Sequence, residues 1–599
     1  MAQQQTPETP VFRAPDPIAL TEALSETAAN ARDAMTAAVQ RAASGAAEPQ
    51  PYDAGAIARS FAEYGMSLAM RPDRVWAQGL KNAAEWTQLW ATTSRRAFGL
   101  DADPVIEPEK GDRRFKDPQW SENPVFDALK QSYLLAGRQT IEMTGLADQL
   151  DDTAKRRVDF FTRQAVAAAA PSNNPLTNPA VLRKTAETGG LNLVKGAGYF
   201  WADAAHGQGL VTRRANEDFE VGRNIACTPG KVVYQNELMQ LIQYDASTEQ
   251  VRKRPLLFVP PVVNKYYLFD LTPKSSYLKW LVDQGHTVFV ISWVNPDLEH
   301  ADKDFAAYLQ EGPLAALDAI RLATGEESVD LVAYCLGGTL SAALLAYLAG
   351  TGQGDRVATA TLVATLIDFS DMGEWSTFVD DDQLKAFERY LDAKGYVEAH
   401  DLTKLFSVVR ANDLIWSSVV NHYLMGEESA PSDLLYWFAD GARIPAGMLR
   451  SYGRTVLQQN KLREPGGMIV GGVPLDLSKV TTPVTLVSLK DDHVSGWDAT
   501  YSATRLFGGE VKFILGGSGH NAGTINPPAA NKHGFWTNEE TPDTAEQWLA
   551  GATKHPGSWW PVWRSMIDRD NPLIPARTVG DGELQPIEPA PGSYAMVRY

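Results

Sequence analysis

The chain has 599 residues, more than one hydrophobic core usually supports, so we expect at least two domains. Its composition, 44% hydrophobic and 21% charged, is typical of a globular protein. The formal net charge of -18 argues against broad nucleic-acid binding, which needs basic patches, and is explained most simply by solubility.

The N-terminal part of the chain is expected to be disordered at first and helical afterwards. Residues 1–15 are rich in Gln, Pro and Thr, a composition typical of disorder. The start of the chain lacks a basic segment followed by an apolar run, so no secretory signal is expected. Residues 16–218 are predicted to form a helical domain, because Ala-rich segments with apolar residues at helical spacing recur, for example at 27–47 and 158–170. Nothing in this domain resembles a catalytic motif.

The pattern changes at about residue 219 to that of an α/β domain, which we expect to extend to residue 575. Apolar runs of strand length alternate with helical segments, which indicates a parallel sheet buried on both faces. The predicted strands are 232–234, 238–244, 256–259, 287–292, 329–334, 361–366, 484–489 and 511–515. Residues 576–599, rich in Pro and Gly, are interpreted as a C-terminal tail. No apolar stretch reaches the roughly 20 residues that a transmembrane segment needs.

A helical and aromatic segment at about 369–472 interrupts the predicted sheet. Its large aromatic side chains include Trp375, Trp416, Tyr423, Tyr436, Trp437 and Tyr452. In α/β-hydrolases an insertion at this place forms a cap over the active site. The alternative is a second packed helical lobe without a gating role.

The most informative stretch of the sequence surrounds one of only two cysteines. The strand predicted at 329–334 runs through Ala333-Tyr-Cys335-Leu-Gly337-Gly338 into a helix at 339–348. This is the nucleophile elbow of α/β-hydrolases, with Cys in place of Ser. Small residues flank the nucleophile because larger side chains would collide in the strained turn. The backbone N–H of Leu336, at the start of the helix, can point at a developing oxyanion.

The two cysteines are interpreted differently because of their surroundings. A lone cysteine in an apolar strand is usually a small buried hydrophobe, but the strand–turn–helix pattern makes Cys335 the candidate nucleophile. Cys227 has no such pattern around it and is interpreted as structural. Two cysteines suggest no disulfide framework and fit a reducing cytoplasm.

A nucleophile elbow predicts a carboxylate and then a histidine, each on a loop after a later strand. The loop after 484–489 contains Asp491, Asp492 and His493, and the Gly-rich loop after 511–515 contains His520. Order favours His520 as the base over His493, which has no later loop from which to reach the nucleophile. For the carboxylate, Asp368 also follows a strand, and order alone does not separate Asp491 from Asp492.

The chain resembles the class I polyhydroxyalkanoate synthases, also known as poly(3-hydroxybutyrate) synthases, from about residue 215 onward. The matching segments fall in order and are Phe219-Glu-Val-Gly-Arg-Asn224, Val259-Pro-Pro-Val-Val-Asn264-Lys-Tyr-Tyr267, Cys335-Leu-Gly-Gly-Thr339, Asp492-His493, Gly519-His520-Asn-Ala-Gly523, Ile525-Asn-Pro-Pro528 and Gly557-Ser-Trp-Trp-Pro561. The resemblance implies an α/β-hydrolase core with a helical cap insertion, preceded by a mostly α-helical domain.

The resemblance also implies roles for individual residues. Cys335 corresponds to the nucleophile, His520 to the base that activates it, and Asp492, rather than Asp491, to the carboxylate. The segment that contains Val263 matches the loop that supplies the second oxyanion donor, beside the N–H of Leu336. His493 is a possible supporting residue.

Such enzymes polymerise short-chain (R)-3-hydroxyacyl-CoA, for example 3-hydroxybutyryl-CoA, into a polyester through an acyl-Cys intermediate and release CoA. A thiol suits this chemistry because thiol-to-thiol acyl transfer is nearly isoenergetic, and the resulting thioester is more reactive than the oxygen ester of the product. A thiol ionises near pH 8.5, so an adjacent histidine can generate the thiolate near neutral pH. We expect no metal and no cofactor other than CoA as the leaving group.

The resemblance further implies a homodimer in the cytoplasm, at the surface of polyester granules and near granule-coating proteins. Two alternatives remain. The first is a lipase- or thioesterase-like hydrolase on the same fold, and the second is a non-catalytic granule-associated protein.

Overall fold

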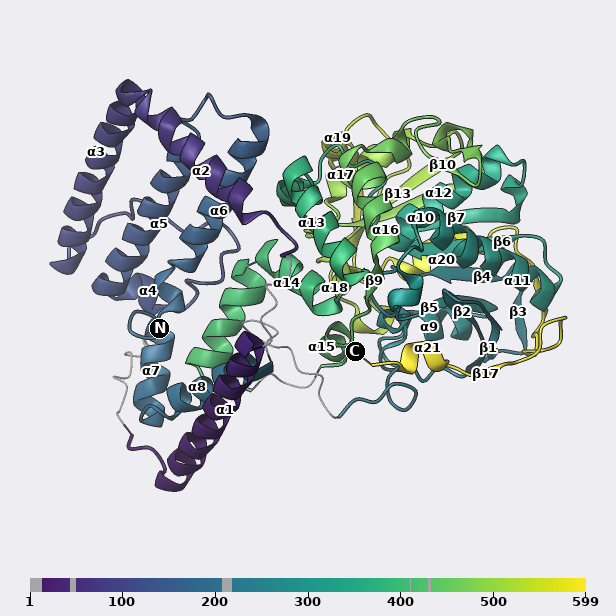
Figure 1. Ribbon diagram of the computed structural model, residues 1–599, viewed down its shortest axis with the longest axis horizontal. Helices are drawn as coiled ribbons and strands as arrows, with labels where there is room; N and C mark the ends of the chain where they lie inside the picture. The colour runs from purple at the N-terminus through teal and green to yellow at the C-terminus, as the bar shows by residue number, and fades with distance from the viewer. Residues whose placement is uncertain (1–12, 44–49, 207–217, 410, 429–431, 599) are drawn as a thin grey trace, which may run out of the picture. The chain divides into compact units, whose positions relative to one another are not determined.

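The structure, a computed structural model, describes residues 13–43, 50–206, 218–409, 411–428 and 432–598 (Figure 1). The chain divides into two compact units: unit 1 comprises Met1–Thr212 and Leu402–Ala430, and unit 2 comprises Arg213–Asp401 and Pro431–Tyr599. Most of the stretch 1–15, for which the sequence predicts disorder, lies outside the described residues.

Unit 1 is helical throughout its described length. Its N-terminal part contains α1 (Pro17–Ala43), α2 (Ala54–Ala69), α3 (Pro72–Ala97), α4 (Gln119–Glu122), α5 (Pro124–Thr144), α6 (Asp152–Ala168), α7 (Pro179–Thr188) and α8 (Leu191–His206). The starts of several helices are set by side-chain caps: Asp53, Asn123, Asp151 and Asn178 each accept a backbone N–H of the helix that follows. Helix α1 packs along α8, and α5 packs against α3 and α6.

A segment of the predicted cap insertion belongs to unit 1. It contains most of α14 (Ala399–Val409) and two π-helical turns, η7 (Asn412–Trp416) and η8 (Val419–Leu424). The hydroxyl of Tyr423 donates to a carboxylate oxygen of Asp203 over 2.7 Å, and Asn192 donates to the Leu424 carbonyl over 2.7 Å. Gly196 of α8 permits this packing, because a Cβ there would overlap the backbone of Tyr423. The sequence predicts one insertion at 369–472 into the second domain, whereas 402–430 belongs to unit 1.

Unit 2 is built on one mixed sheet with the strand order β15-β14-β13-β12-β7-β6-β4-β5-β2-β1-β17. The strands from β13 to β5 in this order pair in parallel, and the strands outside them pair antiparallel. Their bounds are β1 (Gly230–Gln235), β2 (Met239–Tyr244), β4 (Leu256–Val259), β5 (Val288–Trp293), β6 (Val329–Tyr334), β7 (Val357–Val363), β12 (Val484–Leu489), β13 (Val511–Gly516), β14 (Phe535–Thr537), β15 (Thr553–His555) and β17 (Glu588–Pro589).

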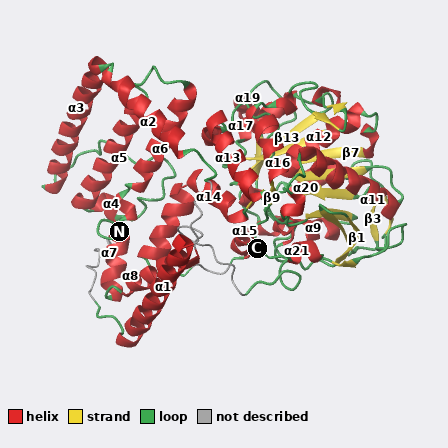
Figure 2. Cartoon of the chain, in the orientation of Figure 1, coloured by secondary structure: helices red, strands yellow, loops and turns green. Residues whose placement is uncertain are grey.

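Helices and short strand pairs surround this sheet (Figure 2). The helices of unit 2 are α9 (Tyr277–Asp283), α10 (Phe305–Leu309), α11 (Ala315–Thr324), α12 (Leu336–Gly350), α13 (Asp381–Lys394), α15 (Asp433–Ala439), α16 (Ala446–Ser451), α17 (Trp497–Ser502), α18 (His520–Thr524), α19 (Ala545–Gly551), α20 (Trp560–Ile567) and α21 (Ser593–Met596). The short pairs are β3 (Gln250–Arg252) with β16 (Leu573–Pro575), β8 (Tyr396–Val397) with β9 (Ile444–Pro445), and β10 (Ile469–Val470) with β11 (Val473–Pro474). None of the described helices is long and apolar enough to cross a membrane.

The C-terminal tail predicted at 576–599 is part of unit 2. Its strand β17 pairs with β1, with Lys231 opposite Pro589 and Val232 opposite Glu588. Strand β7 also differs from the prediction, because it lies at Val357–Val363 rather than at 361–366. Its second and third residues are partly exposed, which hides its start in a search for apolar runs, and it ends where Ala364 adopts a φ of +49°.

Candidate active site

Cys335 lies at the turn between β6 and α12, as the sequence predicts. Its backbone has φ +52° and ψ −127°, a left-handed conformation that costs a non-glycine residue of order 1–3 kcal/mol. The surrounding structure holds it there: the Cys335 N–H donates to the Val363 carbonyl of β7 over 2.9 Å, and the Cys335 carbonyl accepts the N–H of Gly338 over 2.8 Å. The strained turn leaves the cysteine partly exposed at the carboxyl end of the sheet.

Glycine at position 337 allows the start of α12 to approach the loop that follows β4. A Cβ there would lie 2.5 Å from the carbonyl oxygens of both Val259 and Pro260. The carbonyl groups of Val259 and Pro260, which lead into the turn at 262–263, therefore lie against the elbow. Leu336 is the first residue of α12, so its N–H has no acceptor within the helix. Val263, the second predicted oxyanion donor, lies in the turn that follows this contact.

The structure pairs His520 with one of the three candidate carboxylates. His520 Nδ1 lies 2.7 Å from Asp492 Oδ2, and both side chains are largely buried. The other oxygen of Asp492 accepts the N–H groups of Val494 and Ser495 over 2.8 and 2.9 Å. These two N–H groups fix the orientation of the carboxylate toward the imidazole.

The remaining candidates are placed differently. Asp491 and His493 are exposed. Asp368 contacts Asn460 and Arg463, at 2.8 and 2.9 Å, and these contacts hold the segment after β7. Asp492 and His520 are therefore the pair that the structure joins.

The Cys335 sulfur lies close enough to His520 to affect its charge. Burial alone would lower the pKa of His520, but the Asp492 carboxylate and the Cys335 sulfur outweigh it and raise this pKa to about 10. The imidazole is therefore placed to hold a proton at neutral pH, beside the candidate nucleophile.

Buried aromatic residues hold the short helix α18 that carries His520. The Tyr334 hydroxyl donates to Asn521 over 2.7 Å, and its ring lies 5.0 Å from the His520 imidazole. The indole N–H groups of Trp559 and Trp560 donate to carbonyl oxygens at the end of α18 over 3.1 and 3.0 Å. In the sequence these tryptophans stood out only through the family resemblance.

One aromatic residue of the insertion lies near the nucleophile. Tyr452 begins the π-helical segment η9 (Tyr452–Gln458), and its hydroxyl interacts with Thr339 of α12. Burial raises the pKa of this phenol, and the nearby Cys335 raises it further. In the sequence Tyr452 is one of several aromatic residues of the predicted insertion, and its spacing gives no sign of proximity to Cys335.

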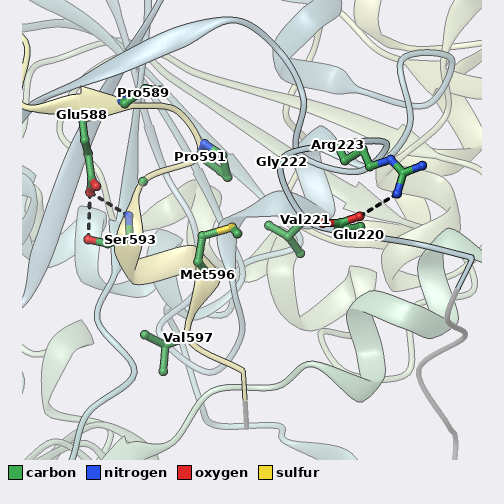
Figure 3. Close-up of a pocket in the computed structure, with 11 residues that line it drawn as sticks. Glu220, Val221, Gly222, Arg223, Glu588, Pro589, Pro591, Ser593, Met596 and Val597 are labelled. Atoms are coloured by element: carbon green, nitrogen blue, oxygen red, sulfur yellow. Dashed lines mark hydrogen bonds and ion pairs between the residues drawn. The ribbon is translucent and has the colours of Figure 1, made fainter.

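The cavity drawn in Figure 3 lies apart from the predicted site residues. It has a volume of about 630 Å³ and is lined by the turn at 220–223 and by the C-terminal segment, with Glu588, Pro589, Pro591, Gly592, Ser593, Met596 and Val597. Within the described ranges, no group of three or more His, Cys, Asp and Glu side chains is arranged to hold a metal ion.

Comparison with known proteins gives matches over most of the chain. The family described as "Poly-beta-hydroxybutyrate polymerase (PhaC) N-terminus" matches residues 111–281, and the "alpha/beta hydrolase fold" family matches residues 275–527. The chain is 44% identical to a poly(3-hydroxyalkanoate) polymerase of Methylorubrum extorquens, over 88% of this chain and 87% of the relative. It is 41% identical to the poly(3-hydroxyalkanoate) polymerase subunit PhaC of Rhizobium meliloti, over 92% of each chain. The prediction of an α/β-hydrolase core preceded by a helical domain is confirmed.

Proposed function

Because this chain belongs to the poly(3-hydroxyalkanoate) polymerases, we propose that it extends the polyester with short-chain (R)-3-hydroxyacyl-CoA, such as 3-hydroxybutyryl-CoA, and releases CoA. The observation that carries this proposal is the 2.7 Å contact between His520 Nδ1 and Asp492 Oδ2, together with the raised pKa of His520, to which the nearby Cys335 sulfur contributes. This arrangement supplies a base beside the candidate nucleophile at the tip of a strained turn, which acyl transfer through a covalent intermediate requires.

In the first step Cys335 takes the acyl group from CoA. His520 holds the proton of the thiol, and the thiolate attacks the carbonyl carbon of the thioester. The negative charge on the carbonyl oxygen is accepted by the backbone N–H groups of Leu336 and Val263. The bond to the CoA sulfur then breaks, CoA takes the proton from His520, and an acyl-Cys335 thioester remains.

In the second step a hydroxyl group attacks the acyl-Cys335, and the carbonyl carbon leaves the sulfur for the oxygen. We assign the base of this step to His520. Both carboxylate oxygens of Asp492 are already engaged, one by His520 and the other by the two N–H groups of Val494 and Ser495. Asp492 therefore orients the imidazole and stabilises its charge, as the carboxylate does in other triads.

The same family membership supports further proposals about where the enzyme works. We propose that it acts as a homodimer in the cytoplasm, at the surface of polyester granules and near granule-coating proteins. Purified enzyme on isolated granules, compared with enzyme in the supernatant, tests the granule association, and sedimentation tests the dimer.

The test of the reaction is CoA release from 3-hydroxybutyryl-CoA, with the pellet analysed for polyester. We expect CoA and polymer from the wild type, loss of both in Cys335→Ala, and at least 100-fold slower release in Cys335→Ser, consistent with the effect of losing an activated nucleophile. Cys227→Ala is the matched control and should retain activity, since Cys227 lies outside the elbow. CoA with free hydroxy acid but no polymer would indicate a thioesterase, and no CoA from any chain length would indicate a non-catalytic protein.

A further inference from the structure

A buried lysine lies two residues beyond Val263, on the loop that follows β4. The Lys265 ammonium contacts both carboxylate oxygens of Asp440, over 2.7 and 2.8 Å. The Lys265 side chain is 4% exposed and that of Asp440 is 5% exposed. Unlike most charged pairs of the chain, this one is therefore removed from solvent.

The same ammonium group binds the C-terminal segment. It donates to the carbonyl oxygens of Ala595 and Val597, over 3.1 and 2.7 Å. This segment is itself attached to the large sheet, because β17 pairs with β1. In addition, Glu588 of β17 accepts hydrogen bonds from Gln240 of β2 and, over 2.8 Å, from the hydroxyl of Ser593. The C-terminal segment thus supplies two hydrogen-bond acceptors to Lys265, which lies more than 300 positions earlier in the sequence.

The insertion is joined to the same loop by further contacts. Asp440 follows α15, and its carboxylate also accepts the hydroxyl of Tyr267 over 2.6 Å. The indole N–H of Trp437 donates to the backbone carbonyl of Lys265 over 2.8 Å. A backbone bridge pairs Asn264 with a residue of the insertion. The loop that follows β4 is therefore fixed through its side chains and also through its backbone.

The cost of burying these charges argues that the cluster fixes the position of the loop rather than adding to the stability of the fold. Burying an ammonium and a carboxylate costs several kcal/mol per ion, so such a pair often contributes no more stability than apolar residues of the same volume. Burial also lowers the pKa of Lys265, against the opposing effect of Asp440. An apolar cluster would pack without directional contacts, whereas the ammonium fixes the relative places of the loop, the insertion and the C-terminal segment.

We propose that Lys265 is a positioning residue: with Asp440 and the carbonyl groups of Ala595 and Val597, it holds the Val263 N–H where the oxyanion forms. This inference rests on the proposed function, because an oxyanion forms only if the chain transfers an acyl group. It also gives the C-terminal segment a part in catalysis, although this segment contributes no reacting group.

The test compares two reactions of the same sulfur. Acylation of Cys335 by 3-hydroxybutyryl-CoA forms an oxyanion, whereas alkylation by iodoacetamide displaces iodide and forms none. Two variants disrupt the cluster. Lys265→Met with Asp440→Leu removes the charged pair and leaves no unpaired buried charge, and a chain that ends at Tyr594 removes the two carbonyl acceptors of Lys265. Lys303→Met is the control, because Lys303 forms an ion pair with Glu311 elsewhere in unit 2.

We expect single-turnover acylation to slow by about 10- to 1000-fold in both cluster variants; the upper part of this range is the roughly 100- to 1000-fold loss seen when one oxyanion donor is removed outright. Alkylation should stay within about twofold of the wild type, and kcat should fall while KM changes little, since the donor acts in the transition state. Lys303→Met should match the wild type in both reactions.

Three outcomes would overturn the inference. Acylation and alkylation that slow together would indicate a general loss of structure around Cys335. Unchanged acylation would exclude a positioning role for Lys265, and the shortened chain gives the same answer if the double variant fails to fold. Absence of acylation in the wild type would instead refute the proposed function, and with it the premise of the inference.

Discussion

The two units of the chain differ in how completely their helices and strands are buried. In unit 2, strands β4, β5 and β6 are buried at every position. In unit 1, the 26-residue helix α3 has one buried residue, Leu89, and its Trp76 and Trp90 are 73% and 69% exposed. Large aromatic residues therefore have different surroundings in the two units: in unit 2 several are buried and hold the short helix that carries His520, and in unit 1 several lie on the surface.

The largest expected difference between the units comes from removing one tryptophan from each of them. Trp560 is fully buried and supports α18, so Trp560→Ala should lower the free energy of unfolding by about 3–5 kcal/mol. Trp90→Ala should change it by less than about 0.5 kcal/mol. Urea denaturation measures both. A similar loss in the free energy of unfolding in the two variants would mean that Trp90 is buried in solution and would contradict its exposed position on α3.

A second comparison uses one added methyl group. Gly337→Ala places a Cβ against two backbone carbonyl groups, which we expect to lower stability by about 1–3 kcal/mol and to slow CoA release. Gly79 of α3 has open space around it, so Gly79→Ala should raise helix stability by up to about 1 kcal/mol and leave CoA release unchanged. A Gly337→Ala enzyme with full activity would show that the loop after β4 need not approach the elbow.

A further prediction concerns pH. The pKa of His520 is raised from 6.5 to about 10, so the stability that its charge gives the folded state is complete below pH 6.5 and is lost as the pH rises through about 10. The difference in unfolding temperature between wild type and His520→Gln should therefore shrink from pH 7 to pH 10.5. Trp90→Ala, which leaves this charge in place, should follow the wild type at every pH. A difference that stays constant with pH would contradict the raised pKa.

Much of the fold could be predicted where packing imposes a local pattern. Strands β4, β6 and β12 lie where the sequence predicts them, because each is a short apolar run buried by its neighbours. Strands β14, β15 and β17 were missed. They are two or three residues long and partly polar, so they depend on pairing with the sheet rather than on a pattern of their own. The place of 402–430 in unit 1 was missed for a similar reason, since it depends on contacts with α8.

The residues of the candidate site also differ in whether the sequence alone could predict them. The elbow around Cys335 and the choice of His520 follow from the pattern and from chain order, whereas Asp492 was separated from Asp491 only by the family resemblance; the structure joins Asp492 with His520. Lys265 could not be found in this way. A single lysine in a sequence is usually exposed, and the acceptors that bury this one lie 175 and 330 positions further along the chain.

The two outer strands of the large sheet carry a consequence for self-association. Both are very short: β15 contains Lys554, and β17 ends with Pro589, which has no N–H to donate. Short, charged or proline-containing strands resist pairing with the strands of another molecule. Within the part of the chain that the structure describes, both edges of the large sheet are therefore poor templates for another strand, so copies of this chain brought close together are not expected to join these sheets into a continuous one.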